Sequence, residues 1–147
     1  MAVTTFKAVA RRKEGLAVIG QARNFKVDID EPISSGGTDT GMNPVEMILC
    51  ALGGCQTIVA SSFAKKFHID LQDFWVELEG DIDLDGFMGL SDVRPGYQTI
   101  RYNMHIKCDA SEEKIKRFVE FIEKTCPVGD TLGNEVKLER TKITIEK

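Results

Sequence analysis

The feature that most constrains the fold of this chain is a long apolar segment that runs from Asn43 to about His68. Asn43 can accept a hydrogen bond from the unpaired amides of a first helical turn, and Pro44 suits the first helical position because its missing N–H is not needed there. The segment VEMILCALGGCQTIVASSFA then has little polar character on any face. A helix that is apolar all round is buried on all sides, so we expect it inside a sheet-lined core or against a second subunit.

Two glycines and a group of polar residues interrupt this helix near Cys55. Gly53 and Gly54 each cost about 1 kcal/mol relative to alanine in a helix interior, so their presence predicts close approach by another element. Hydrogen-bonding side chains follow where the helix is otherwise most apolar, and such a patch predicts a pocket. These side chains are Gln56, Thr57, Ser61 and Ser62.

Short stretches of alternating apolar and polar residues precede the helix, as half-buried strands do. They lie in residues 4–13, 16–22 and 24–30 and predict a three-stranded meander. Residues 31–41 are rich in Pro, Gly, Ser and Thr, which predicts a loop.

Two further strands are predicted after the helix, in residues 74–84 and 98–109, as an antiparallel pair joined by a loop. Ser111 is expected to cap a second helix that covers one sheet face, and residues 134–147 predict a last strand with a bulge. The chain therefore reads as a single α+β domain over residues 1–147. The side chains expected to face inward are Val76, Leu78, Ile82 and Leu84 on the first strand, Tyr102, Met104, Ile106 and Cys108 on the second, and Ile115, Phe118, Val119 and Ile122 on the helix.

Size and charge exclude several classes of function. A chain of 147 residues fits one domain with a sizeable core. The net charge is −4 and charges of both signs alternate, which argues against a nucleic-acid surface. No apolar run reaches the roughly 18 residues of a membrane span, and the first residues lack the apolar segment of an export signal. We therefore expect a cytoplasmic protein that binds no membrane.

Metal and cofactor chemistry are not expected. The chain has two histidines, His68 and His105, and neither forms a ligand-spaced pair with a cysteine or a carboxylate. No phosphate-binding loop, dinucleotide fingerprint or Ser-His-Asp arrangement is present.

The four cysteines are expected to be reduced thiols, because their irregular spacing does not suggest a disulfide framework. Cys50 and Cys108 fit apolar core positions. Cys50 and Cys55 lie about 140° apart around the helix, so they should not pair. Cys126 directly precedes Pro127, where the free amides of a new helical turn would favour a thiolate. The alternative is that Cys126 only ends the second helix and Pro127 only breaks it.

Two segments resemble a known family. The run GGTDTGMNPVEMILCALGGCQTI in residues 36–58 resembles the segment around the reactive cysteine of OsmC/Ohr proteins, and TCPVGDTL resembles the segment around their second cysteine. The order of elements matches as well, so the resemblance covers nearly the whole chain. It implies an intertwined homodimer with long helices packed in the centre and mostly antiparallel sheets wrapped around them.

The resemblance also implies a thiol-dependent peroxidase of oxidative stress defence, acting on organic hydroperoxides and less efficiently on hydrogen peroxide. Cys55 matches the position that attacks the peroxide and becomes a sulfenic acid, and Cys126 matches the resolving cysteine that condenses with it to a disulfide. An external dithiol would then reduce the disulfide. The alternatives are a non-enzymatic dimer of the same fold that binds a small hydrophobic ligand, and a redox-responsive stress protein.

The sequence departs from the best-characterised branch of this family beside the Asn-Pro helix start. There a glutamate follows the proline and pairs with an arginine of the N-terminal strands, whereas here Val45 follows and Glu46 comes about 100° further around the helix. Glu46 is about 13 Å along the axis from Cys55, so it is better placed to serve the site of a second subunit. A cation should stabilise the Cys55 thiolate, and the candidates are Arg11, Arg12 and Lys13.

Overall fold

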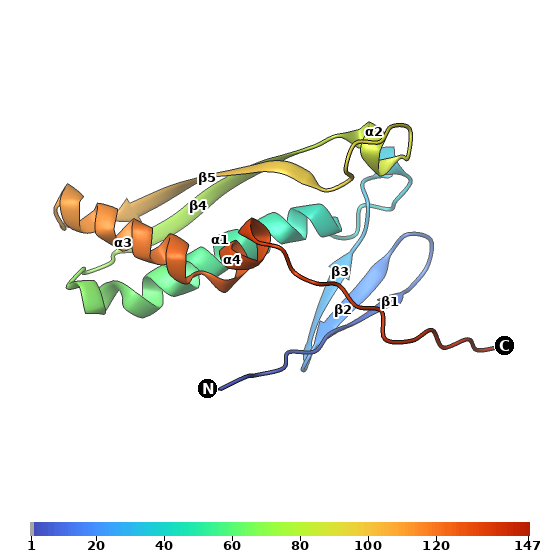
Figure 1. The fold of residues 1–147 in the computed structure, drawn as a ribbon, viewed down its shortest axis with the longest axis horizontal. Helices are drawn as coiled ribbons and strands as arrows, with labels where there is room; N and C mark the ends of the chain where they lie inside the picture. Colours follow the sequence, from blue (N-terminus) through green and yellow to red (C-terminus); the bar gives the residue numbers. More distant parts are fainter. Residues whose placement is uncertain (1) are drawn as a thin grey trace. The chain divides into compact units, whose positions relative to one another are not determined.

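A computed structural model describes residues 2–147 of the chain (Figure 1). The backbone forms two compact units, one that extends to Cys50 and one that begins at Ala51. The predicted α+β class is confirmed, since antiparallel strands and a long helix make up the structure.

The first unit contains the predicted meander, with β1 (Val9–Arg12), β2 (Val18–Ala22) and β3 (Phe25–Ile29) in sequential order. Both pairings are antiparallel, with Arg11 opposite Ile19 across the first. The predicted loop follows β3 and includes one short 3₁₀ turn at Ile33–Ser35.

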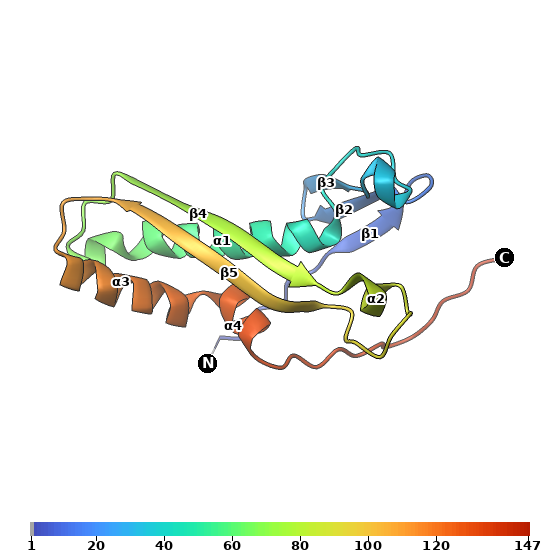
Figure 2. The ribbon, with the colours of Figure 1, turned by 90° about the horizontal axis from the view of Figure 1, so that it is seen from above.

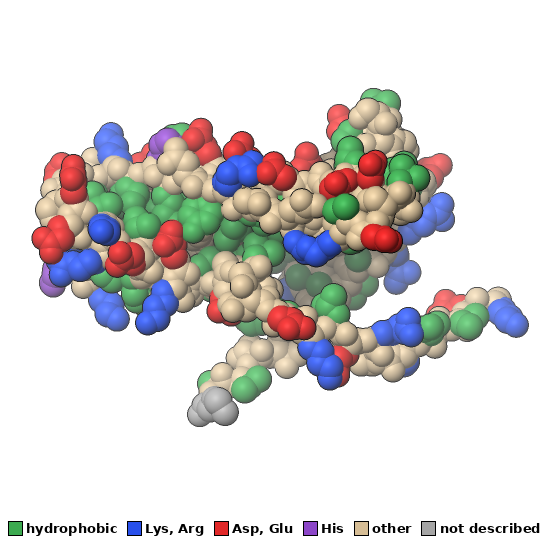
Figure 3. Space-filling view, turned by 45° about the horizontal axis from the view of Figure 1, so that its top comes forward, with side chains coloured by type: hydrophobic (Ala, Val, Ile, Leu, Met, Phe, Trp, Pro, Cys, Tyr) green, Lys and Arg blue, Asp and Glu red, His purple; other side chains and the backbone are tan. Residues whose placement is uncertain are grey.

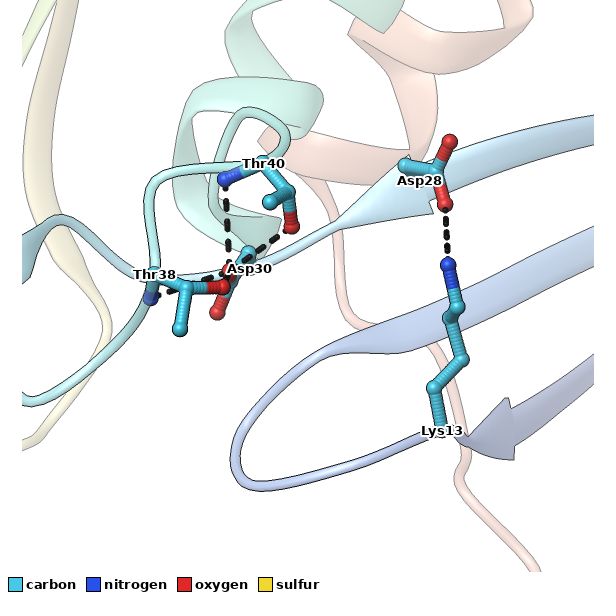
Figure 4. Close-up of polar contacts among 5 residues, drawn as sticks. All are labelled: Lys13, Asp28, Asp30, Thr38 and Thr40. Atoms are coloured by element: carbon cyan, nitrogen blue, oxygen red, sulfur yellow. Dashed lines mark hydrogen bonds and ion pairs between the residues drawn. The ribbon is translucent and has the colours of Figure 1, made fainter.

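Asp30 organises this loop (Figure 4). Its buried carboxylate accepts hydrogen bonds from the hydroxyls of Thr38, at 2.5 Å, and Thr40, at 2.8 Å, and from the amide of Glu31, at 2.8 Å. The Thr38 hydroxyl and the Glu31 amide hold the pKa of the Asp30 carboxyl well below its usual range, although burial opposes them. The loop is therefore tied to the end of β3 by one ionised carboxylate.

Helix α1 (Pro44–Phe63) begins with a reciprocal capping box. The Glu46 amide donates to Asn43 Oδ1, and the Asn43 amide donates to Glu46 Oε2, each at 2.9 Å. The helix tightens into the 3₁₀ turn η2 (Ala64–Phe67) and ends at His68, whose φ is +54°. The predicted extent of the helix is confirmed, with a 3₁₀ rather than an α-helical last turn.

The second unit contains the predicted antiparallel pair, β4 (Asp73–Ile82) and β5 (Tyr97–Lys107). Val76 and Leu78 face the core as expected, and Phe74 joins them there. The prediction for Leu84 was wrong. A short helix, α2 (Leu84–Phe87), replaces the end of the predicted strand, because the side chain of Asp83 caps its first turn and Leu84 becomes exposed.

Helices α1 and α3 (Glu112–Thr125) lie on one face of the strand pair, as Figure 1 and Figure 2 show from two directions. The hydroxyl of Ser111 caps α3 as predicted, by accepting from the Lys114 amide at 3.3 Å. The core between these elements contains Leu52, Val59, Ala60, Ala64, Ile69, Phe74, Phe118, Ile122 and Cys126.

The two glycines of α1 have different surroundings. A Cβ atom on Gly53 would lie 2.7 Å from Leu78 Cδ1, so the predicted close approach is confirmed there and its partner is β4. A Cβ on Gly54 would meet nothing within 4 Å. One face of the helix is therefore packed within the chain, while the other remains open, with Ile58 67% exposed.

The apolar character of α1 corrects one expectation. Together with η2 it forms a 24-residue helix that contains an 18-residue window with a mean hydropathy of 1.6, which by length and composition is sufficient to cross a membrane. The prediction that no segment could span a membrane was based on unbroken apolar runs. In α1 the interrupting residues are small or uncharged, so the average hydropathy stays high. Buried core helices of soluble proteins also meet this criterion.

The predicted last strand was also wrong. After α4 (Pro127–Gly133), residues 135–147 pair with no strand in the part of the chain that the structure describes, and Leu138 is 93% exposed. Alternation indicates that a segment can be half buried, but a strand also needs the edge of another strand to bond with.

We expect the substitution Asp30→Asn to lower the midpoint of thermal unfolding at pH 7, because it removes the charge to which the threonine hydroxyls donate. The folded-state pKa is lowered, so the contribution of Asp30 is present above about pH 4 and is lost as the pH falls further. The difference between wild type and variant, followed by circular dichroism, should therefore shrink from pH 5 to pH 2. Asp28→Asn, at the exposed ion pair with Lys13, is the matched control and should change little.

Candidate functional site

Cys126 occupies the junction between two helices. Its amide donates to the Ile122 carbonyl at 3.0 Å and ends α3, while its Sγ accepts from the Gly129 amide at 3.3 Å and caps α4. Pro127 takes the first position of α4. Cys126 therefore ends one helix and also meets the free amides of the next, so it does more than end α3.

The structure brings Cys126 together with Cys55, although 70 residues lie between them in the sequence. Cys55 is half-buried on α1, whereas Cys126 is 1% exposed. Burial raises the pKa of the Cys126 thiol, and Cys55 raises it further, so the two side chains lie close to each other.

Burial raises the pKa of the Cys126 thiol above its usual value, and the hydrogen bond and charge of Cys55 add to this effect. The amides of Gly129 and Val128 act in the opposite direction, as expected for a helix start, but they do not prevail. The expectation that free amides favour a Cys126 thiolate is corrected here, because desolvation in the core outweighs two hydrogen bonds.

The helices approach each other closely around this pair. A Cβ on Gly129 would lie 3.5 Å from Cys126 Sγ and 3.7 Å from Leu52 Cδ1, so the first turn of α4 rests on α1 one turn before Cys55. Gly53 in that same turn contacts Leu78 of β4. The two sulfur atoms thus lie where α1 meets the α3–α4 junction.

Tyr102 and Glu123 also belong to this region, and sequence reasoning gave neither a role. Tyr102 alternates with Met104 and Ile106 on β5 but is 40% exposed; it lies opposite Leu78, and its hydroxyl donates to Glu123 Oε1 at 3.0 Å. Burial raises the pKa of the Tyr102 hydroxyl, as do Glu123 and the charge of Cys126. The available signal was weak. Glu123 lies three residues before Cys126 on a helix, a spacing that places both on one side.

The polar residues after Cys55 differ from the predicted pocket. The hydroxyls of Thr57 and Ser61 donate to the carbonyls of Gly53 and Thr57, four residues earlier in their own helix. Gln56 is buried, and its Oε1 atom lacks a hydrogen-bond partner among residues 2–147. Two of the polar side chains therefore bond to the backbone of their own helix and do not indicate a cavity.

The other expected site residues lie in the first unit, each with a local contact. Glu46 completes the capping box of α1. Arg12 Nε donates to the Gly15 carbonyl at 3.1 Å, and Lys13 pairs with Asp28 at 3.3 Å, as Figure 4 shows. Arg11 lines a hollow of about 490 Å³ on the meander. The other residues that line this hollow are Lys7, Ala8, Val9, Ile19, Gln21, Arg23 and Lys26.

The remaining cysteines stand apart from this pair. All four thiols are free, Cys108 packs beside the core as expected, and Cys50 is exposed. The prediction of a core position for Cys50 was wrong, because it lies on a face of α1 that the chain itself leaves open. Among residues 2–147, no group of three or more His, Cys, Asp or Glu side chains could hold a metal ion.

Comparison with known proteins gives consistent results. A curated hydroperoxide reductase of Mycoplasma genitalium is 28% identical over 112 residues, which cover 74% of this chain and 73% of the relative. A solved OsmC-like protein from Mycoplasma pneumoniae superposes with a TM-score of 0.78 at 22% identity, covering 88% of each chain. An organic hydroperoxide resistance protein OsmC from Legionella pneumophila superposes with a TM-score of 0.67 at 18% identity, covering 90% of this chain and 91% of its own.

These two superpositions confirm the predicted fold. The model of the OsmC family, described as OsmC-like protein, matches residues 37–141, which is well over half of the sequence. The match includes Cys55, Cys126 and the strand pair between them. The chain therefore belongs to the OsmC-like family.

Proposed function

We propose that this protein is a thiol-dependent peroxidase that reduces organic hydroperoxides, and hydrogen peroxide less efficiently, in cytoplasmic defence against oxidative stress. The observation that carries the proposal is the proximity of two thiols from separate elements, one half-buried on α1 and one enclosed by the core. The hydroperoxide reductase names of two Mycoplasma relatives, each 28% identical, support a peroxide-related function.

The proposed cycle has three steps. The Cys55 thiolate attacks the O–O bond of a hydroperoxide, and with one proton this gives a sulfenic acid on Cys55 and an alcohol. The thiol of Cys126 then condenses with the sulfenic acid, which forms a disulfide and releases water. An external dithiol reduces the disulfide by exchange and is itself oxidised to a disulfide.

The positions of the two sulfurs favour this division of roles. Cys55 is half-buried and can be reached by a substrate, whereas Cys126 is buried and protonated. A thiol must lose its proton to act as a strong nucleophile, so the protonated Cys126 is poorly suited to attack the peroxide first. It is well placed to trap the sulfenic acid that forms beside it.

We further propose that a cation of the N-terminal strands stabilises the Cys55 thiolate when two subunits assemble. Lys13 already has a carboxylate partner in Asp28, and Arg12 donates to a backbone carbonyl. Arg11 lies in a hollow with three other cations. The charge of Lys13 is already balanced by a carboxylate. The two arginines are therefore the better candidates to pair with a thiolate. Glu46, already engaged in the capping box, would orient such a cation.

A homodimer is part of the same proposal. No charged residue lies between Glu46 and Lys65, and the open face of α1 carries small and apolar side chains. Water is a poor environment for such a face, whereas a second copy of the helix would cover it, with Gly54 allowing close approach. The open residues on this face are Cys50, Ala51, Gly54, Ile58, Ser61 and Ser62.

We expect the purified protein to consume cumene hydroperoxide faster than hydrogen peroxide when dithiothreitol is the reductant, and far more slowly with a monothiol. A dithiol can complete the exchange with a buried disulfide within one molecule, whereas a monothiol leaves a mixed disulfide. Spectroscopic measurement of the remaining peroxide gives the rate. Cys55→Ser should abolish consumption, and a protein whose activity survives this change would contradict the proposal.

Replacing Cys126 with serine should leave the first turnover intact but allow Cys55 to advance to the sulfinic acid, since no thiol remains to trap the sulfenic form. Intact-mass spectrometry after one and then several equivalents of hydroperoxide would detect one added oxygen and then two. Cys108→Ser is the matched control, because Cys108 packs beside the core away from this pair and should still allow the disulfide. An unmodified Cys55 in the Cys126→Ser variant would count against the mechanism.

Sedimentation velocity should detect a dimer at micromolar concentration. We expect its interface to bury more than about 2,000 Å² in total, as the interfaces of obligate dimers do. Ile58→Glu should shift the protein toward monomer, because it places a charge on the open face of α1. Lys116→Glu, on the exposed side of α3, introduces the same side chain elsewhere and should leave the dimer intact. A wild-type monomer would rule out the assembly.

A further inference from the structure

The hydrogen bond between Tyr102 and Glu123 connects two layers of the fold next to the cysteine pair. Tyr102 belongs to β5 and Glu123 to the last turn of α3, and the donor–acceptor distance is 3.0 Å. The register of the sheet places Tyr102 opposite Leu78, and Leu78 contacts Gly53, two residues before Cys55. This bond therefore joins α3 to the part of the sheet against which the Cys55 turn packs.

Elsewhere α3 and β5 meet through apolar side chains. A groove of about 440 Å³ runs between them, and Figure 3 shows hydrophobic side chains gathered in this region. Its apolar walls are Met104 and Ile106 on the strand and Ile115 and Val119 on the helix, and Tyr102 and Glu123 also line it. Because apolar contacts are not directional, the hydrogen bond is the contact here that can fix the helix at one position along the strand.

The end of α3 determines where Cys126 lies. Glu123 is three residues before Cys126, and the amide of Cys126 makes the last hydrogen bond of the helix, to Ile122. A shift of this turn away from β5 would carry the Cys126 sulfur with it. The charge of Cys126 also contributes to the raised pKa of Tyr102, which is consistent with their proximity.

We propose that Tyr102 and Glu123 are positioning residues for the resolving half of the cycle: their hydrogen bond holds the last turn of α3 on β5 and thereby holds the Cys126 thiol against Cys55. This inference rests on the proposed function. The step concerned forms the S–S bond and breaks the S–O bond of the sulfenic acid, and the oxygen leaves as water with its own proton and that of the Cys126 thiol. The peroxide step does not involve Cys126, so it should not depend on this bond.

The test separates the two steps in the full-length protein. Reduced protein receives one equivalent of cumene hydroperoxide, samples are quenched with dimedone to label the sulfenic acid, and intact masses give sulfenate and disulfide against time. Tyr102→Phe and Glu123→Ala should oxidise Cys55 at the wild-type rate but form the disulfide at least about 10-fold more slowly, because small displacements of reacting groups cost about 100-fold in rate. Glu123→Gln retains an acceptor oxygen and should restore most of the wild-type rate.

Tyr97→Phe is the matched control for the hydroxyl, on the same strand, and should leave both steps unchanged. Wild-type disulfide formation in Tyr102→Phe would overturn the inference. So would a Glu123→Gln variant as slow as Glu123→Ala, because the effect would then come from the charge. If Cys55 of the wild type forms no sulfenate, the proposed function itself fails. That result differs from one in which the variants form both the sulfenate and the disulfide at wild-type rates, which would overturn only this inference. Circular dichroism of each variant identifies any loss of fold, and Glu123→Gln, which keeps the bond, then decides the question.

Discussion

The close approach of α1 to β4 at Gly53 is the contact on which the candidate site depends. A side chain at this position would collide with Leu78, so only glycine allows the helix to lie this near the strands. At this separation Leu52 reaches the first turn of α4. The Gly129 amide in that turn donates a hydrogen bond to Cys126 Sγ. The position of the Cys126 sulfur is thus set by packing between layers rather than by the segment that contains it.

Burial then gives two chemically equal thiols unequal roles. Cys126 is enclosed by the core, where an ionised sulfur would lose its hydration, and two backbone amides do not compensate for that loss. Cys55 keeps partial access to solvent on the surface of the same packing. The fold therefore places a partly accessible sulfur beside an enclosed one of the same residue type.

Most of the secondary structure could be predicted from the sequence because its signals are local. Asn43 and Pro44 mark the start of α1, Ser111 marks the start of α3, and alternation assigns the inward face of both long strands. What failed depended on partners far along the chain. Residues 135–147 have the alternation of a strand but no edge to pair with, and Cys50 has the composition of a core residue but lies on an open face.

The cysteine pair could be named through a family resemblance, but its geometry could not be predicted. Nothing in the local sequence of Cys126 specifies that burial outweighs the helix amides, since burial arises from α1. Tyr102 and Glu123 were missed for the same reason, because their contact joins a strand to a helix across 21 residues of sequence.

Cys126 caps α4 with the same sulfur that meets Cys55, and this places two demands on one atom. In the thiol form the sulfur can accept the Gly129 amide while its proton points to Cys55. A disulfide to Cys55 would fix the position of the Cys126 sulfur. The hydrogen bond from the Gly129 amide to that sulfur would then weaken as the disulfide forms. Helix α4 has only seven residues and little internal stability to replace a lost cap. Oxidation should therefore loosen α4 first, and the fraying of this short helix would open a path by which a reductant reaches an otherwise enclosed disulfide.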